Sequence, residues 1–270
     1  MISNIILSVA VLAALGFILG AGLAYAARAF TITRDPRIDA VLAELPGANC
    51  GACGYPGCSG YAEALVTGSA LITGCPVSGK EIGEHIADII GQEERMDISS
   101  DKMISVVKCR GNNDTSARIF NYSGLEDCRA AARFYGGPKK CRHGCLGMGT
   151  CIGVCPFSAI TMSSLKLPVI NGDRCTGCGL CVDACPRQVM VMMPKRAGVQ
   201  VLCNSGEAAK IARQVCSKSC IKCHKCADIC PTVAISFDNG PAKINFDLCT
   251  GCGLCVQKCP VKCIYEADRG

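Results

Sequence analysis

The sequence has no tryptophan and few of the side chains that build a large apolar core. Aromatic residues make up 5% of its 270 residues and charged residues 19%, and histidine occurs 3 times. A chain of this length ordinarily forms one or two domains, each around a core of large side chains. The shortage of such side chains favours several small units instead, in which metal ligation supplies part of the folding free energy.

Nucleotide-binding motifs are also missing. No G-x-G-x-x-G fingerprint follows an expected strand and no Walker A sequence occurs, while Gly147 and Gly149 belong to a cysteine-containing loop. We therefore expect this chain to bind neither nicotinamide nor nucleotide, and we assign it no catalytic residues.

What the sequence has in excess is cysteine, with 25 residues, together with 30 glycines. The chain is too long for a small disulfide-stapled secreted domain. The cysteine count is odd, and most cysteines lie two or three residues apart, where Cα positions rarely suit a disulfide. Such clustering predicts metal or iron–sulfur ligation.

The amino-terminal segment is apolar. Residues 5–27 carry no charge, and at about 1.5 Å per residue a helix of this length spans about 34 Å, enough to cross a bilayer. Arg28, Arg34 and Arg37 follow the segment, and no Lys or Arg precedes it. By the positive-inside rule we expect a single-pass anchor in the lipid of the cell membrane, with the rest of the chain on the cytoplasmic side.

Two other interpretations of this segment remain open. A cleaved signal peptide would use Ala24-Tyr25-Ala26 as its cleavage site, although the segment lacks a preceding positive charge and exceeds the usual length of a signal core. A buried helix of a soluble protein is the third interpretation.

The first cysteine group combines a glycine-rich loop with one distant thiol. Cys50, Cys53 and Cys58 lie in the loop CGACGYPGC, and Cys75 follows 17 positions after Cys58. Glycine lets the backbone turn tightly around the sulfur atoms. Four thiolates predict a cage for one [4Fe–4S] cluster, and a structural zinc ion is the alternative because four cysteines suit it equally.

Three later segments match C-x2-C-x2-C-x3-C-P without deviation. This is the ligation motif of bacterial [4Fe–4S] ferredoxins, in which the fourth cysteine serves the other cluster of a pair. The three are Cys175, Cys178, Cys181 and Cys185; Cys220, Cys223, Cys226 and Cys230; and Cys249, Cys252, Cys255 and Cys259.

A fourth motif is altered, and it shows that the chain contains a duplication. Three of its cysteines stand 75 positions before their counterparts in the second regular motif, and they are Cys145, Cys151 and Cys155. Met148 stands at the remaining position, and thioether sulfur is a poorer iron ligand than thiolate. We therefore expect Cys141 to complete this site, whereas its counterpart Cys216 has no vacancy to fill.

Crossing of the fourth cysteines holds two clusters side by side in each module. The expected ligand sets are Cys141, Cys145, Cys151 and Cys185; Cys155, Cys175, Cys178 and Cys181; Cys220, Cys223, Cys226 and Cys259; and Cys230, Cys249, Cys252 and Cys255. Together with the amino-terminal group they predict about five [4Fe–4S] clusters, with these cysteines as iron ligands.

These patterns predict an α+β fold. A transmembrane anchor over residues 1–27 precedes a four-cysteine [4Fe–4S] domain over 28–95. Two tandem bacterial two-cluster ferredoxin-like modules follow, the first over 96–195 with an amino-terminal extension and the second over 196–270. Residues 159–162 and 234–237 read as short strands with return strands over 167–170 and 242–246, which predicts a small β-hairpin in each module.

Five cysteines lie outside these sets: Cys109, Cys128, Cys203, Cys216 and Cys263. We expect them to be buried free thiols that pack as small apolar groups. A sixth cluster would need four of these five, and they are scattered along the sequence.

The formal net charge is +6 when thiols are counted as neutral. Five [4Fe–4S] cores held by thiolates would add about −10 and leave about −4, so nucleic-acid binding is not expected. A basic group surrounds the altered motif and the second module: Lys139, Lys140, Arg142, Lys218, Lys222 and Lys225. It would either steer an acidic ferredoxin or balance the charge of the clusters.

Over essentially its whole length the chain resembles the B subunit of the Rnf complex, a membrane-bound, ion-translocating ferredoxin-dependent oxidoreductase. The anchor, the segments CGACGYPGC and GCLGMGTCIGVCPFSAI, and the repeated CTGCGLC carry this resemblance. It implies an electron-transfer subunit of an oxidoreductase complex (a translocase), which accepts electrons from soluble ferredoxin and passes them to sister Rnf-type subunits. Those sister subunits carry the flavins, the nicotinamide chemistry and the movement of Na⁺ or H⁺.

Two other functions are compatible with the motifs. A polyferredoxin subunit of a membrane hydrogenase or formate-type complex would use the same relay chemistry, although the first cysteine group argues against it. A zinc-rich scaffold, or a redox sensor that loses its clusters, belongs to a different functional class.

Overall fold

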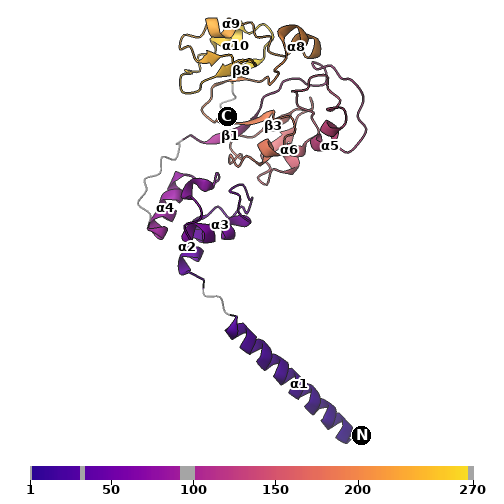
Figure 1. The fold of residues 1–270 in the computed structure, drawn as a ribbon, viewed down its shortest axis with the longest axis vertical. Helices are drawn as coiled ribbons and strands as arrows, with labels where there is room; N and C mark the ends of the chain where they lie inside the picture. The colour runs from indigo at the N-terminus through magenta and orange to yellow at the C-terminus, as the bar shows by residue number, and fades with distance from the viewer. Residues whose placement is uncertain (1, 31–33, 92–100, 267–270) are drawn as a thin grey trace.

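The computed structural model describes residues 2–30, 34–91 and 101–266. Figure 1 shows a long helix at one end, a small helical domain beside it, and a mixed helix and strand region at the other end. The prediction of an α+β fold with an amino-terminal apolar helix is confirmed.

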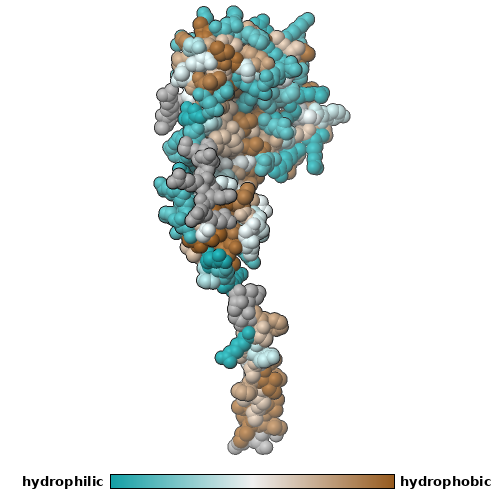
Figure 2. Space-filling view, turned by 60° about the vertical axis from the view of Figure 1, so that its left-hand side comes forward, coloured by the Kyte–Doolittle hydropathy of each residue, from teal (hydrophilic) through white to brown (hydrophobic). Residues whose placement is uncertain are grey.

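Helix α1 (Ile2–Ala29) is apolar on every side. Its span Ile5–Ala29 has a mean hydropathy of 2.5, and none of it is buried inside the protein. Large apolar side chains such as Phe17 and Leu23 are more than two-thirds exposed, and Figure 2 shows the helix as an apolar rod. A helix of this length and composition fits the hydrocarbon core of a bilayer.

The small helical domain contains α2 (Pro36–Glu44), α3 (Gly57–Val66), the 3₁₀ turn η1 (Ile72–Gly74) and α4 (Lys80–Ile90). The side chain of Asp35 accepts a hydrogen bond from the backbone N–H of Arg37 at 2.9 Å and so caps the first turn of α2. Val41, Leu65 and Ile86 form the centre of its core, at 1% exposure or less. This core fixes the loop that carries the first cysteine group.

The region from residue 101 onward repeats one topology twice. In the first copy, β1 (Met103–Val107) pairs antiparallel with β4 (Met190–Pro194), and β2 (Ile160–Met162) pairs with β3 (Pro168–Ile170). In the second, β5 (Val199–Val201) pairs with β8 (Ile264–Glu266), and β6 (Ile235–Ser236) pairs with β7 (Lys243–Ile244). The predicted hairpins β2–β3 and β6–β7 are confirmed, whereas sequence reasoning did not foresee the outer pairs.

Short helices separate the strands of each copy. The first copy has α5 (Cys128–Arg133), α6 (Thr150–Gly153) and α7 (Leu180–Asp183); the second has α8 (Ala209–Val215), α9 (Lys225–Asp228) and α10 (Leu254–Lys258). Buried cysteines form a large part of both cores. Thiol sulfur thus occupies much of the space that large side chains fill in an ordinary core.

The two copies are joined by backbone hydrogen bonds. The N–H of Ala117 donates to the carbonyl of Val215 at 3.1 Å, and the N–H of Ser217 donates to the carbonyl of Thr115 at 2.9 Å. The segment 115–117, in the amino-terminal extension of the first copy, therefore pairs with the end of α8 in the second copy.

Candidate iron–sulfur sites

The amino-terminal cavity is lined by all four cysteines of the first group: Cys50, Cys53, Cys58 and Cys75. Gly57 begins α3 with φ +84°, and a Cβ there would lie 2.9 Å from Oδ1 of Asn49. That same oxygen accepts the backbone N–H of Cys58 at 2.8 Å. Glycine is therefore required for the turn that aims Cys58 into the cavity.

Tyr61 closes the inner side of this cavity. Its hydroxyl donates to the carbonyls of Leu71 and Ile72, at 2.6 and 3.0 Å. Burial, followed by the neighbouring thiolate charges of Cys75 and Cys53, raises the pKa of Tyr61 to about 12. The site is thus shielded from water on the side facing the domain core.

Three further cavities each gather cysteines from two separate motifs. Their linings include Cys155, Cys175, Cys178 and Cys181; Cys220, Cys223, Cys226 and Cys259; and Cys230, Cys249, Cys252 and Cys255. In each case the distant cysteine is the one expected from the crossed ferredoxin pattern. A residue with left-handed backbone immediately precedes each adjoining short helix: Gly179 at φ +81° before α7, His224 at +60° before α9 and Gly253 at +73° before α10.

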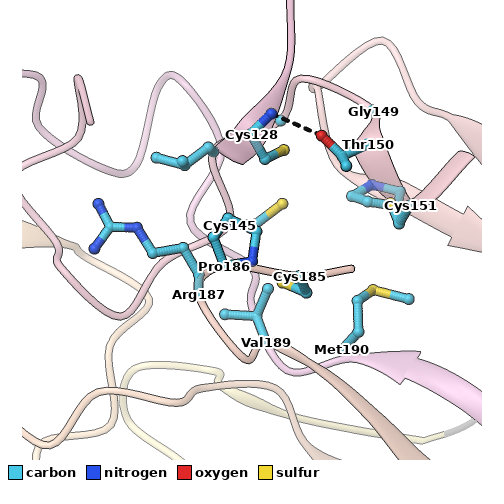
Figure 3. Close-up of a pocket in the computed structure, with 13 residues that line it drawn as sticks. Cys128, Cys145, Gly149, Thr150, Cys151, Cys185, Pro186, Arg187, Val189 and Met190 are labelled. Atoms are coloured by element: carbon cyan, nitrogen blue, oxygen red, sulfur yellow. Dashed lines mark hydrogen bonds between the residues drawn. The ribbon is translucent and has the colours of Figure 1, made fainter. Parts of the chain in front are cut away.

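The altered motif has a different fourth thiol from the one expected. Its cavity is lined by Cys128, Cys145, Cys151 and Cys185 (Figure 3), and Cys141 does not line it. Cys128 is the first residue of α5, and its backbone N–H donates to the hydroxyl of Thr150 at 2.7 Å. The segment before the altered motif thus places a thiol at this cavity, whereas Met148 does not line it.

Sequence reasoning missed Cys128 because the residue lies 17 positions before the altered motif. One local feature of the sequence indicates a helix that begins at Cys128, because Asp127 is a favoured helix-cap residue. In the structure its carboxylate accepts the backbone N–H groups of Arg129 and Ala130. The same carboxylate accepts the hydroxyl of Thr150 at 2.9 Å. These contacts hold the start of α5 against α6 and place Cys128 at the cavity.

Three family descriptions match this chain. "Putative Fe-S cluster" matches residues 45–77, "4Fe-4S binding domain" matches 168–191, and "4Fe-4S dicluster domain" matches 219–263. The chain is 44% identical over 98% of its length to the B subunit of the Na(+)-translocating ferredoxin:NAD(+) oxidoreductase complex of Acetobacterium woodii, covering 78% of that protein.

Two further relatives match nearly their whole length. The B subunit of the ion-translocating oxidoreductase complex of Methanosarcina acetivorans is 42% identical over 98% of this chain and 99% of its own. The B subunit of the proton-translocating ferredoxin:NAD(+) oxidoreductase complex of Clostridium ljungdahlii is 38% identical over 99% of this chain and 94% of its own. The chain belongs to this family of Rnf-type B subunits.

The donor set of this Rnf-type chain fits iron–sulfur clusters. Within the described residues, no group of three or more His, Cys, Asp or Glu side chains is arranged to hold a single metal ion. The cysteines instead surround cavities, four or five thiols to each. Burial raises the pKa values of Cys145 and Cys151 to about 12, so ionising them in these sites needs the positive charge of bound iron.

Cys263 adds a fifth sulfur to the cavity of Cys220, Cys223, Cys226 and Cys259. Its Sγ lies 3.7 Å from Sγ of Cys259, and its hydrogen bond lowers the pKa of Cys259 to about 5. Val189 lies at the matching position of the first copy, four residues after Cys185, and lines the corresponding cavity.

Two of the three histidines and two of the basic residues occupy structural positions. His224 stacks on Phe237 with ring centroids 4.1 Å apart, and His143 lies 3.8 Å from Glu207. Lys222 donates to two backbone carbonyls, and Lys139 is only 2% exposed. Lys139 therefore does not belong to a surface patch.

Proposed function

We propose that this chain relays electrons through [4Fe–4S] clusters between soluble ferredoxin and the sister subunits of an Rnf-type complex. The observation that carries the proposal is the set of five cavities that are each lined by four or five cysteines. We assign the ligands as Cys50, Cys53, Cys58 and Cys75; Cys128, Cys145, Cys151 and Cys185; Cys155, Cys175, Cys178 and Cys181; Cys220, Cys223, Cys226 and Cys259; and Cys230, Cys249, Cys252 and Cys255. Such clusters, when bound, supply one-electron chemistry within a window of roughly −700 to +450 mV.

The chain's own groups tune these sites through hydrogen bonds to sulfur. The N–H of Ala159 donates to Sγ of Cys155 at 3.4 Å, and the N–H of Ala234 donates to Sγ of Cys230 at the same distance. Both copies of the module thus repeat one stabilising contact to a thiolate. Such contacts, together with burial, set the electron affinity of an iron–sulfur site.

Neighbouring sites are close enough to feel one another's charge. Burial raises the pKa of Cys178, and the thiolate charge of Cys50 from the amino-terminal domain raises it further. This domain therefore lies beside the first ferredoxin-like module, as a continuous electron path requires.

The second module is where we place the contact with ferredoxin. Cys223 and Cys252 are exposed, so two of its cavities reach the surface. Lys225 is also exposed, and positive charge next to Cys223 would attract an acidic electron carrier. This module lies at the opposite end of Figure 1 from α1, which suits a soluble partner that approaches from the cytoplasmic side of a lipid-anchored chain.

Anaerobic purification of the full chain tests the proposal. We expect a brown protein that holds at least about twenty irons and whose absorbance bleaches on mixing with reduced ferredoxin. Bleaching should slow as salt is added, because charge steers the encounter. A colourless protein with stoichiometric zinc would contradict the electron-transfer role.

A further inference from the structure

Four cysteines outside the five cavities come together where the two modules meet. Cys109, Cys141, Cys203 and Cys216 are each 9% exposed or less. A Cβ placed on Gly111 would lie 3.2 Å from Sγ of Cys216 and 3.7 Å from Sγ of Cys109. One sulfur atom from each module therefore approaches the same point of the backbone.

The other two thiols belong to the same group. Sγ of Cys203 lies 3.6 Å from the hydroxyl of Ser219, whose backbone N–H donates to the carbonyl of Cys216 at 3.1 Å. Burial, followed by the charges of Cys109, Cys203 and Cys216, raises the pKa of Cys141 to about 11. Cys141 and Cys216 also pack together with Val215 in one small buried cluster. The four thiols that the sequence leaves scattered are thus neighbours in the fold.

The duplication makes these four thiols two matched pairs. Cys109 follows β1, and its Sγ accepts the backbone N–H of Cys145 at 3.3 Å. Cys203 follows β5, and its Sγ accepts the backbone N–H of Cys220 at 3.3 Å. The two sulfur atoms therefore occupy equivalent positions, each in contact with the first cysteine of the motif in its own module, Cys145 or Cys220.

The second matched pair is Cys141 and Cys216, which lie 75 positions apart and four residues before those first cysteines. Each module thus directs one cysteine from a strand end and one from the segment before its motif toward the shared interface. Thiols that only fill apolar space need not occupy equivalent positions in both modules and meet at one interface.

Two polar groups at this interface lack the partners that burial demands. Lys139 donates to the carbonyl of Gly111 at 2.6 Å, and within the described residues it makes no ion pair. A buried ammonium needs a nearby negative charge. The buried hydroxyl of Ser116, which faces Cys216 in a β-bridge, has no hydrogen-bond partner in the part of the chain that the structure describes. An anionic, sulfide-bearing group among the thiols would satisfy both.

We propose that Cys109, Cys141, Cys203 and Cys216 ligate a sixth [4Fe–4S] cluster, with Lys139 as its buried counter-charge. Four thiolates around a core of about +2 carry about −2, and Lys139 offsets part of that charge. The inference rests on the proposed electron-transfer function and extends it. The site contacts Cys145 of one module and Cys220 of the other, so it joins two pairs of clusters into one continuous relay.

Iron counting on the anaerobically purified full chain tests the site. We expect about 24 irons in the unchanged chain, and about 20 after either Cys141→Ala or Cys216→Ala. The double variant should lose no more iron than either single variant, because both residues serve one cluster. Val215→Ala is the matched control, since it removes apolar volume from the same buried cluster as Cys141 and Cys216 without removing a thiol, and it should leave the iron content unchanged.

The alternatives give different results. About 20 irons in the unchanged chain, with no loss in Cys216→Ala, would overturn the sixth site while leaving the other five intact. One zinc per chain that disappears in Cys216→Ala would also overturn it, because the site would then hold a single ion. Failure of the proposed function itself would appear separately, as an unchanged chain without reducible iron. The residual iron of each variant reports whether the rest of the chain has folded.

Discussion

The assignment of Cys128 allows a test in which a ligand is lost and then regained. Replacing Cys128 with alanine leaves three thiols, Cys145, Cys151 and Cys185, around the cavity. A [4Fe–4S] cluster needs four ligands, so we expect the variant to lose up to about four irons per chain. Cys141→Ala should also lose iron, but from the interface site, so the two losses should add in the double variant.

The duplication indicates where a replacement ligand can be introduced. Met148 stands 75 positions before Cys223, which lines the corresponding cavity of the second module. Adding Met148→Cys to the Cys128→Ala chain should therefore restore the lost iron, because it recreates the regular motif. Iron content and the electron paramagnetic resonance of the dithionite-reduced protein are the measurements. Full iron content in Cys128→Ala, or a failure of Met148→Cys to restore it, would refute the assignment.

Three other predictions concern tuning, folding and anchoring. Cys263→Val should keep the iron content but lower the reduction potential of the adjacent cluster, because a hydrogen bond to thiolate sulfur is lost. Redox titration measures this potential, and an unchanged value would contradict the prediction. Gly57→Ala should destabilise the first cluster by at least about 1–2 kcal/mol in denaturant titrations of its absorbance, since the new Cβ meets Asn49 at a positive φ. The control Gly79→Ala, where φ is −72° and no atom lies within 4 Å of the added Cβ, should have a smaller effect, limited to the loss of the glycine N-cap of α4. Removal of residues 2–33 should release the chain from membranes in a sedimentation assay with its iron retained, and a truncated chain that still sediments with lipid would argue against the anchor.

The regular motifs could be interpreted from the sequence because their thiols are local. Three cysteines within seven positions must face one cavity, and the crossed ferredoxin pattern then indicates which distant thiol joins them. The hairpins β2–β3 and β6–β7 were also predictable, since their strands are adjacent in sequence. The pairing of β1 with β4 was not, because about 80 residues separate the two strands and only tertiary packing sets their register.

Cys109 and Cys128 show where sequence reasoning reached its limit. Cys109 and Cys203 are 94 positions apart, whereas the motif cysteines of the two modules are 74 or 75 apart. An ungapped repeat therefore matches Cys203 with Cys128 and hides its true counterpart. The extra residues in the first module include α5, so the insertion that conceals this pairing also contains Cys128, the thiol that we propose in place of Met148.

The exposed thiols of the second module are more susceptible to oxidation than the buried thiols between the modules. Cys223 and Cys252 are open to solvent, whereas Cys109, Cys141, Cys203 and Cys216 are enclosed between the modules. Oxidants attack accessible thiolate sulfur first. On exposure to air, oxidation should therefore begin at Cys223 and Cys252 of the second module. Iron bound between the two modules should be lost last.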